Sequence, residues 1–241
     1  KPKVIQTINT ILKTYPFYLT GISPCGKHQS YYCHGFLPPG GSIRSNAFFQ
    51  EGIEVAKALS KKGIAAFVLK TGWFQPSNQK KEGLNETYTK EKKQLTYGHL
   101  DALNAIAHIR KNKINRVLIP IRSVSWGSLL EGVSIEATYK SEEHNRPNFV
   151  APIYPWMVIV EDQDPPSYGP PLFGYIPTAD KLKLAIPSAE FYIDWAEKDF
   201  ISELHNYQNG EHGFGMKKTV YPVDNWFNIL IDWMGAIGML N

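Results

Sequence analysis

Three side chains in this sequence could together perform nucleophilic catalysis, and each follows an apolar run of strand length. Ser125 lies in "RSVSWGS", between such a run and residues that could form a helix. Asp180 ends "PPLFGYIPTAD", and His212 lies among glycines in "NGEHGFGM". A serine hydroxyl becomes a good nucleophile when a histidine takes its proton and a carboxylate orients that histidine. The three residues therefore predict acyl transfer through Ser125, with His212 as base and Asp180 as orienting acid.

Ser125 has a rival two residues upstream. A nucleophilic serine on a sharp strand-to-helix turn needs small residues two positions before and two positions after it. Ser123 and Gly127 hold those positions around Ser125. If Ser123 were the nucleophile, Ile121 would hold the first of them and would crowd the turn. We therefore favour Ser125 over Ser123.

The base and the acid also have competitors. His205 falls inside an expected strand, and His144 falls in a polar loop, so neither is as well placed as His212 on its glycine-rich loop. Asp199 competes with Asp180, but it falls at the far end of an expected helix, which is the wrong edge of the sheet. We assign Asp199 a solvated or capping role.

Acyl transfer also needs backbone N–H groups that bind the developing oxyanion. One is expected from Trp126, the residue after the nucleophile. The other is expected from Gly40, Gly41 or Ser42 in "LPPGGSIRSN", where prolines stiffen the loop entry and glycines let the backbone approach a substrate closely.

Strand-like and helix-like patterns alternate along the chain. Apolar runs of strand length fall at 31–37, 64–70, 116–121, 148–154, 171–176 and 203–207. The helical patterns between them place four sets of residues on common faces: Ile53, Ala56 and Leu59; Leu100, Leu103 and Ala107; Ala189, Tyr192, Ile193 and Ala196; and Trp226, Ile229, Leu230, Trp233 and Ile237. Gly63 is the expected stop of the first helix and Asp224 the expected N-cap of the last. The alternation predicts an α/β fold with a doubly wound, mostly parallel sheet, whose active groups gather at the carboxyl ends of its strands.

Bulk composition sets limits on the class of protein. The 241 residues are 43% hydrophobic and 20% charged, which predicts a single globular domain over 1–241. The net charge of +4 is modest, and the densest basic stretch, 80–93, also contains glutamates, so no nucleic-acid partner is expected. No apolar run approaches the roughly 18 residues of a membrane span, so a soluble chain without a membrane partner is expected. The compartment stays open, with a slight preference for a secreted or periplasmic protein, and the oligomeric state is undetermined.

No metal or organic cofactor is expected. Cys25 and Cys33 are the only cysteines and permit one disulfide or two free thiols. With His28 and His34 they form a short cluster, but its spacing matches no standard zinc pattern.

Several long stretches give the chain a family resemblance. It resembles α/β-hydrolases of the esterase/lipase type, in the group that includes acetyl xylan esterases and feruloyl esterases. The matching stretches are 38–70, 100–110, 146–155, 170–180 and 203–226, and the last is the most specific because it combines "GEHGFG" with "PVDNW". The strand-to-helix turn around Ser125, the nucleophile elbow, reads Ser-Val-Ser-Trp-Gly-Ser where the family usually has Gly-Phe-Ser-Ala-Gly-Gly. The oxyanion loop has Ser42 where a glycine is usual.

The resemblance implies the same triad, Ser125, Asp180 and His212, and an oxyanion hole that includes Gly40, Gly41 or Ser42. It implies a serine ester hydrolase that removes small acyl groups, acetyl or cinnamoyl-type, from a small ester or an acylated plant polysaccharide. Only about sixteen residues separate two expected strands where hydrolases often insert a lid, which predicts little or no lid. A peptidase on the same triad and a catalytically silent binding protein remain alternatives.

Aromatic residues could line such an open site. Trp73, Trp126 and Trp156 could stack on sugar or cinnamoyl rings, although packing is the more common role of a tryptophan.

Overall fold

The structure, a computed structural model, describes residues 7–8, 18–22, 34–37, 48–70, 98–111, 122–123, 125–126, 131–157, 160 and 163–240. Its strands are β1 (Thr7–Ile8), β2 (Tyr18–Ile22), β3 (His34–Leu37), β4 (Ala65–Lys70), β5 (Arg122–Ser123), β6 (Ser125–Trp126), β7 (Pro152–Ile153), β8 (Leu172–Pro177) and β9 (Ser202–Tyr207). They form two sheets, in the orders β1-β2-β4-β3-β5 and β6-β7-β8-β9. One residue separates β5 from β6 in the sequence, so the chain passes from the first sheet to the second at this point.

Most of the pairing is parallel. β2 runs antiparallel to β1 and β4, whereas every other pair, from β4-β3 through β8-β9, is parallel. The chain leaves β3 toward β4 on one side and then returns to β5 on the other side. In doubly wound sheets such a reversal of strand order opens a crevice at the carboxyl ends of the strands, which is where ligands bind.

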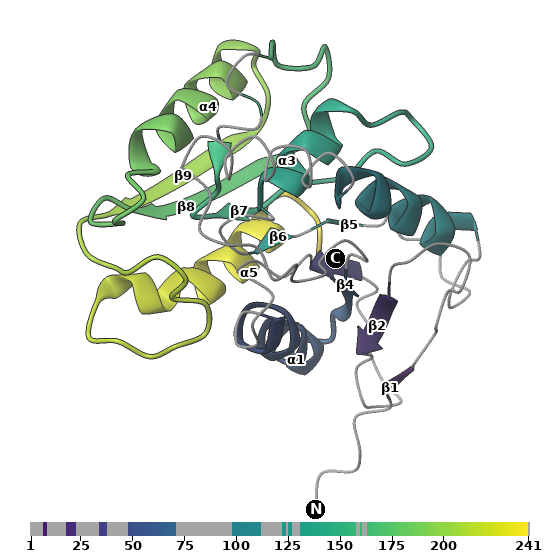
Figure 1. Ribbon diagram of the computed structural model, residues 1–241, viewed down its shortest axis with the longest axis horizontal. Coiled ribbons are helices and arrows are strands. Elements are labelled where there is room, and N and C mark those ends of the chain that lie inside the picture. The colour runs from purple at the N-terminus through teal and green to yellow at the C-terminus, as the bar shows by residue number, and fades with distance from the viewer. Residues whose placement is uncertain are drawn as a thin grey trace, which may run out of the picture.

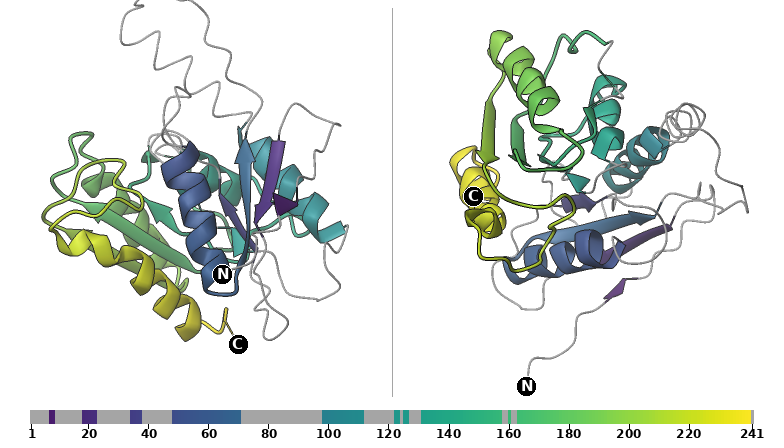
Figure 2. Two further views of the ribbon diagram at one scale, coloured as in Figure 1. Left: turned by 90° about the horizontal axis from the view of Figure 1, so that it is seen from below. Right: turned by 60° about the vertical axis from the view of Figure 1, so that its left-hand side comes forward.

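Helices cover both faces of the sheet (Figures 1 and 2). The helices and helical turns are η1 (Phe48–Ile53), α1 (Glu54–Lys61), an unlabelled helix over 98–111, α3 (Glu131–Tyr139), α4 (Ala185–Glu197), η3 (Pro222–Asn225) and α5 (Trp226–Ala236). In Figure 1, α1 and α5 lie below the sheet, and α3, α4 and the 98–111 helix lie above it.

The side chains of β4 show why two layers of helices are needed. Ala66 and Val68 belong to a core cluster with α1 and α5, whereas Phe67 and Leu69 belong to a second cluster with α3, α4 and the 98–111 helix. Because successive side chains of a strand point to opposite faces, a continuous apolar run such as residues 66–69 of β4 must be covered on both faces.

The predicted doubly wound, mostly parallel sheet is confirmed. The apolar runs contain β3, β4 and β7, and they contain all but one terminal residue of β8 and of β9. The predicted strand 116–121 lies outside the described residues, and β1 and β2 were not predicted. Gly63 ends α1 as predicted, with φ 83° and its N–H donating to the Ser60 carbonyl oxygen.

One predicted helix face is wrong, and a second is wrong in part. On α4 the buried residues are Ala185, Ser188, Phe191 and Trp195, whereas Ile193 of the predicted face is 49% exposed. Phe191 and Trp195 are two large apolar aromatic residues, whereas the predicted face has one aromatic, Tyr192, whose hydroxyl favours water, so Phe191 and Trp195 decide which face turns inward. On the 98–111 helix Leu103 is buried as predicted, whereas Leu100 is 46% exposed, because the buried stripe runs through Ala102, Leu103, Ala105, Ile106 and Ile109.

The predicted N-cap Asp224 is also wrong. It lies inside η3, and its carboxylate accepts hydrogen bonds from the N–H and the hydroxyl of Thr219. The residue at the N-cap of α5 is Asn225, and it makes no side-chain capping bond.

Candidate active site

Asp180 lies at the carboxyl edge of the sheet, just beyond β8. The turn that carries it is closed by its own N–H, which donates to the Pro177 carbonyl oxygen at 3.2 Å. Its side chain is fully buried, and Oδ1 accepts a hydrogen bond from the Leu182 N–H at 2.8 Å. This bond leaves Oδ2 to face the next loop.

That next loop carries His212 and follows β9. Beyond the ends of the two strands, Thr178 and Ala179 still donate to the carbonyl oxygens of Tyr207 and Gln208, so the two loops leave the sheet side by side. His212 Nδ1 lies 2.7 Å from Asp180 Oδ2, and the histidine side chain is 19% exposed. The structure therefore brings these two sequence-predicted residues together.

The hydrogen bond to Asp180 determines what the other ring nitrogen can do. A carboxylate acceptor holds the proton on Nδ1, so Nε2 presents a lone pair. Nε2 is buried, and within the described part of the chain no partner lies within hydrogen-bond distance of it. A buried, unpaired imidazole nitrogen oriented by a carboxylate can accept a proton from a hydroxyl placed beside it.

Ser125 lies on β6, next to β7, the strand that leads to Tyr154 and its contact with His212. β6 pairs with β7 in parallel, with Ser125 opposite Pro152 and Trp126 opposite Ile153. The next residue, Tyr154, packs its ring edge-on to His212, with 5.0 Å between the ring centroids. Ser125 is thus on the strand adjacent to the one that ends against His212, while its own side chain and that of Trp126 lie outside the description.

Other predicted positions fall outside the described residues or differ from expectation. Gly40, Gly41, Ser42, Cys25, Cys33 and Trp73 lie outside them. Strand pairing continues through Trp126, further along than the predicted strand end, and α3 begins at Glu131. Trp156 is partly buried and packs against both core clusters.

The competing residues lie elsewhere. His205 is on β9 and pairs with Glu203. His144 is exposed, with its Nδ1 3.5 Å from a Glu142 carboxylate oxygen. Asp199 is exposed between α4 and β9, at the amino edge of that strand.

Two residues of this edge were not anticipated from the sequence. Glu51, on η1, is only 5% exposed, and Tyr154, just after β7, is fully buried. The Tyr154 hydroxyl donates to Glu51 Oε1 at 3.2 Å and accepts from the Gly215 N–H at 3.3 Å. The sequence carries no signal for either residue, because the burial of Glu51 and the position of Tyr154 are set by the packing of distant segments.

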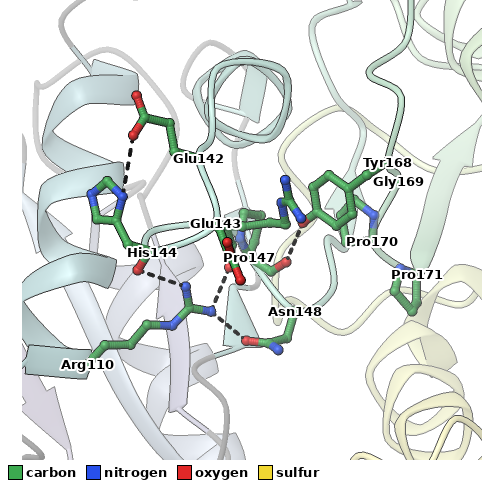
Figure 3. Close-up of a pocket in the computed structure, with 11 residues that line it drawn as sticks. Arg110, Glu142, Glu143, His144, Pro147, Asn148, Tyr168, Gly169, Pro170 and Pro171 are labelled. Atoms are coloured by element: carbon green, nitrogen blue, oxygen red, sulfur yellow. Dashed lines mark hydrogen bonds and ion pairs between the residues drawn. The ribbon is translucent and has the colours of Figure 1, made fainter.

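A cavity of about 850 Å³ lies at the opposite edge of the sheet (Figure 3). It is lined by the segment after α3 and by the residues that precede β7 and β8, among them Asn148 and Gly169. Arg110 anchors this segment by donating to the carbonyl oxygens of His144 and Arg146 and to Asn148 Oδ1. Because this cavity is at the amino ends of the strands, it is separate from the Asp180–His212 pair.

Neither a metal-ligand cluster nor a membrane-crossing helix is present among the described residues. They contain no group of three His, Cys, Asp or Glu residues placed to hold a metal ion. Nor does any helix among them have the length and apolar character that a membrane crossing requires.

The strand order, the two helical layers and the residues at the carboxyl edge define an α/β-hydrolase fold. Several solved structures are similar in fold to this chain over nearly its whole length. An acetyl ester-xyloside bifunctional hydrolase from Caldicellulosiruptor lactoaceticus is 19% identical, with a TM-score of 0.67 over 98% of this chain and 97% of that one. MGS-M1, an α/β hydrolase from a Medee basin deep-sea metagenome library, is 18% identical, with a TM-score of 0.69 over 97% of each chain. A thermophilic esterase from Thermogutta terrifontis is 15% identical, with a TM-score of 0.71 over 98% of this chain and 93% of that one.

At sequence identities of 15–19%, these similarities show a shared fold. No protein-family model matches the sequence, and no curated protein is significantly similar to it.

Proposed function

We propose that this protein is a serine-dependent carboxylic ester hydrolase with the triad Ser125, His212 and Asp180. The observation that carries the proposal is the Asp180–His212 pair, with His212 Nδ1 2.7 Å from the carboxylate and Nε2 buried without a partner among the described residues. The pairing of β6 with β7, which ends at Tyr154 against His212, supports Ser125 as the group that meets Nε2.

The reaction divides into two acyl transfers. His212 Nε2 takes the Ser125 hydroxyl proton as the serine oxygen attacks the ester carbonyl carbon. The imidazolium, stabilised by Asp180, then protonates the leaving alkoxide as the bond to it breaks. His212 next deprotonates a water molecule, whose oxygen attacks the acyl-serine, and the acid leaves as the proton returns to Ser125.

The charge of both tetrahedral intermediates needs stabilisation by N–H donors. We assign these to the backbone of Trp126 and of Gly40, Gly41 or Ser42. The topology supports this assignment, because the strand order reverses at β3, and β6 follows the neighbouring strand β5 after one residue of sequence.

The substrate we propose is a small acyl ester, acetyl or cinnamoyl-type, on a plant polysaccharide. One structural neighbour is described as an acetyl ester-xyloside hydrolase and another as an esterase, which supports ester chemistry on this fold. The resemblance of the sequence to acetyl xylan and feruloyl esterases supports the polysaccharide. No cofactor or metal takes part in the proposed steps.

Labelling with a fluorophosphonate, followed by peptide mass spectrometry, tests the nucleophile. The adduct is expected on Ser125 and is expected to vanish in Ser125→Ala, while Ser123→Ala still labels. Acetate release from acetylated xylan and ferulate release from feruloyl esters then test the substrate class. An adduct on Ser123 alone would refute the proposed triad.

The altered elbow favours one further candidate, a catalytically silent binding protein on this fold. Ser123 replaces the usual glycine two residues before Ser125. A folded protein that takes no label and hydrolyses no ester would support that alternative.

A further inference from the structure

We propose that Glu51, acting through Tyr154, is a positioning residue that holds the His212 loop in its reactive geometry. The inference rests on the proposed function for its effect on catalysis. Its structural part, that Glu51 and Tyr154 fix the His212–Asp180 bond, can be measured without any substrate.

The first observation is the backbone of Tyr154. Its φ is 52°, in the left-handed region, where a bulky side chain is seldom found. The ring is nevertheless fully buried, and the Tyr154 N–H donates to the Tyr175 carbonyl oxygen at 2.7 Å. Residues held in sparsely populated backbone conformations cluster at functional sites and persist only where the surroundings fix them.

The second observation is what the strained residue connects. The Tyr154 hydroxyl donates to Glu51 Oε1 and accepts from the Gly215 N–H, and its ring makes a T-shaped contact with the imidazole of His212. One side chain therefore joins η1, the end of β7 and the loop after β9. Phe214 also packs on Tyr154, in a T-shaped contact with the ring centroids 4.7 Å apart.

The third observation is the close packing of the histidine loop on Glu51. A Cβ built on Gly213 would lie 3.4 Å from Glu51 Oε1, and one built on Gly215 would lie 3.4 Å from Glu51 Cγ. Both glycines have positive φ, so they supply the turns that bring the loop onto η1. Glu51 thus packs against Gly213, the residue after His212, and is linked to the same loop at Gly215 through the Tyr154 hydroxyl.

These contacts give Glu51 a role that Asp180 cannot fill. Asp180 fixes the ring orientation of His212 through Nδ1 but does not hold the segment that follows it. Glu51 and Tyr154 hold that segment at Gly215, and a carboxylate is a stronger acceptor for the tyrosine hydroxyl than a neutral group. Displacement of a catalytic group by about 1 Å can cost about 100-fold in rate.

The test compares Tyr154→Phe, Glu51→Leu and Glu51→Gln. Tyr154→Phe and Glu51→Leu each break the connection, and we expect kcat to fall by about 10- to 100-fold with KM changed by less than about twofold. Glu51→Gln keeps an acceptor of the same shape and is expected to restore kcat to within about threefold of wild type. The matched control is Tyr175→Phe, which removes a buried hydroxyl bonded to the Val223 carbonyl oxygen and leaves Glu51 untouched.

The spectroscopic readout is the downfield proton resonance of the His212 N–H that is bonded to Asp180. It is expected to broaden or shift in Tyr154→Phe and Glu51→Leu and to persist in Glu51→Gln and Tyr175→Phe. If the resonance and kcat of folded Tyr154→Phe match those of Tyr175→Phe, the positioning role is refuted. If the resonance responds as expected but wild type hydrolyses no ester, the positioning role stands and the proposed function fails.

Discussion

At the scale of single residues, the two carboxylate oxygens of Asp180 have separate tasks. Oδ1 accepts the Leu182 N–H and fixes the carboxylate on its own turn, while Oδ2 meets His212 Nδ1 at 2.7 Å. Because the side chain is fully buried, water does not compete for either oxygen. The orientation of the imidazole is therefore set by one rigid acceptor.

Asp180→Asn separates geometry from charge. The amide can keep the bond from the Leu182 N–H, but its NH₂ group would then face Nδ1 and favour the tautomer whose Nε2 carries the proton. A protonated Nε2 cannot act as a base, so we expect kcat to fall by about 10³- to 10⁴-fold with little change in KM. Hydrolysis of a chromogenic acetate ester measures this, beside Asp199→Asn as an exposed control. Activity within about tenfold of wild type would exclude the orienting role.

The sequence carries enough information for some of these residues and not for others. Asp180 and His212 could be picked out because each follows an apolar run, and the carboxyl ends of parallel strands meet at one edge. Glu51 and Tyr154 could not, because their meeting depends on how three connecting segments pack at that edge. A positive φ at a tyrosine has no sequence signature either.

At the scale of elements, one arginine organises the segment between α3 and β7. Arg110, at the end of the 98–111 helix, donates to the carbonyl oxygens of His144 and Arg146 at 3.2 and 2.6 Å and to Asn148 Oδ1 at 2.7 Å. Burial lowers the pKa of its guanidinium, and these three acceptors compensate for the lost water (Figure 3).

Arg110→Met keeps much of the apolar stem and removes the donors. The three acceptors would then lose their partner, and we expect the free energy of unfolding to fall by about 1–3 kcal/mol. The neighbouring exposed Lys111→Met is the matched control, expected within about 0.5 kcal/mol of wild type. Urea unfolding monitored by tryptophan fluorescence gives both values. Equal midpoints for the two variants would show that the donors contribute nothing.

Elements were predictable where one physical signal dominated. β4 and β8 are largely apolar runs of strand length, and although β9 also contains the polar residues Glu203, His205 and Asn206, all three strands were anticipated within about a residue. The inward face of α4 was not, since its periodicity allowed two faces and the aromatic packing of Phe191 and Trp195 chose between them. β1 has only two residues, too few for a periodic signal, and β2 forms part of the sheet by pairing antiparallel with β4.

At the scale of the whole molecule, three tyrosines in different parts of the fold have pKa values raised by burial. Burial raises the pKa of Tyr168 to about 12, an effect that the nearby Arg146 and Arg110 partly oppose. Burial also raises the pKa of Tyr139, helped by the charges of Asp194 and Asp164. The pKa of Tyr175 is raised by burial and by the hydrogen bond of Tyr175 with Tyr207. The folded protein therefore retains protons that the unfolded chain releases near pH 10.

This difference makes the stability fall in alkali. Below the unfolded pKa of about 10 both states hold the protons and stability is independent of these groups; above it the unfolded state ionises first, so the free energy of unfolding decreases as pH rises. Each retained proton contributes at most about 1.4 kcal/mol per pH unit, and less for a partly exposed ring. We expect the urea midpoint to be flat from about pH 7 to 9 and to drop between about pH 10 and 11. Tyr168→Phe should make that drop shallower, because one of the three protons is then absent from both states. An unchanged slope in Tyr168→Phe, with tyrosinate absorbance rising before unfolding, would show that this tyrosine titrates in the folded protein as it does in water.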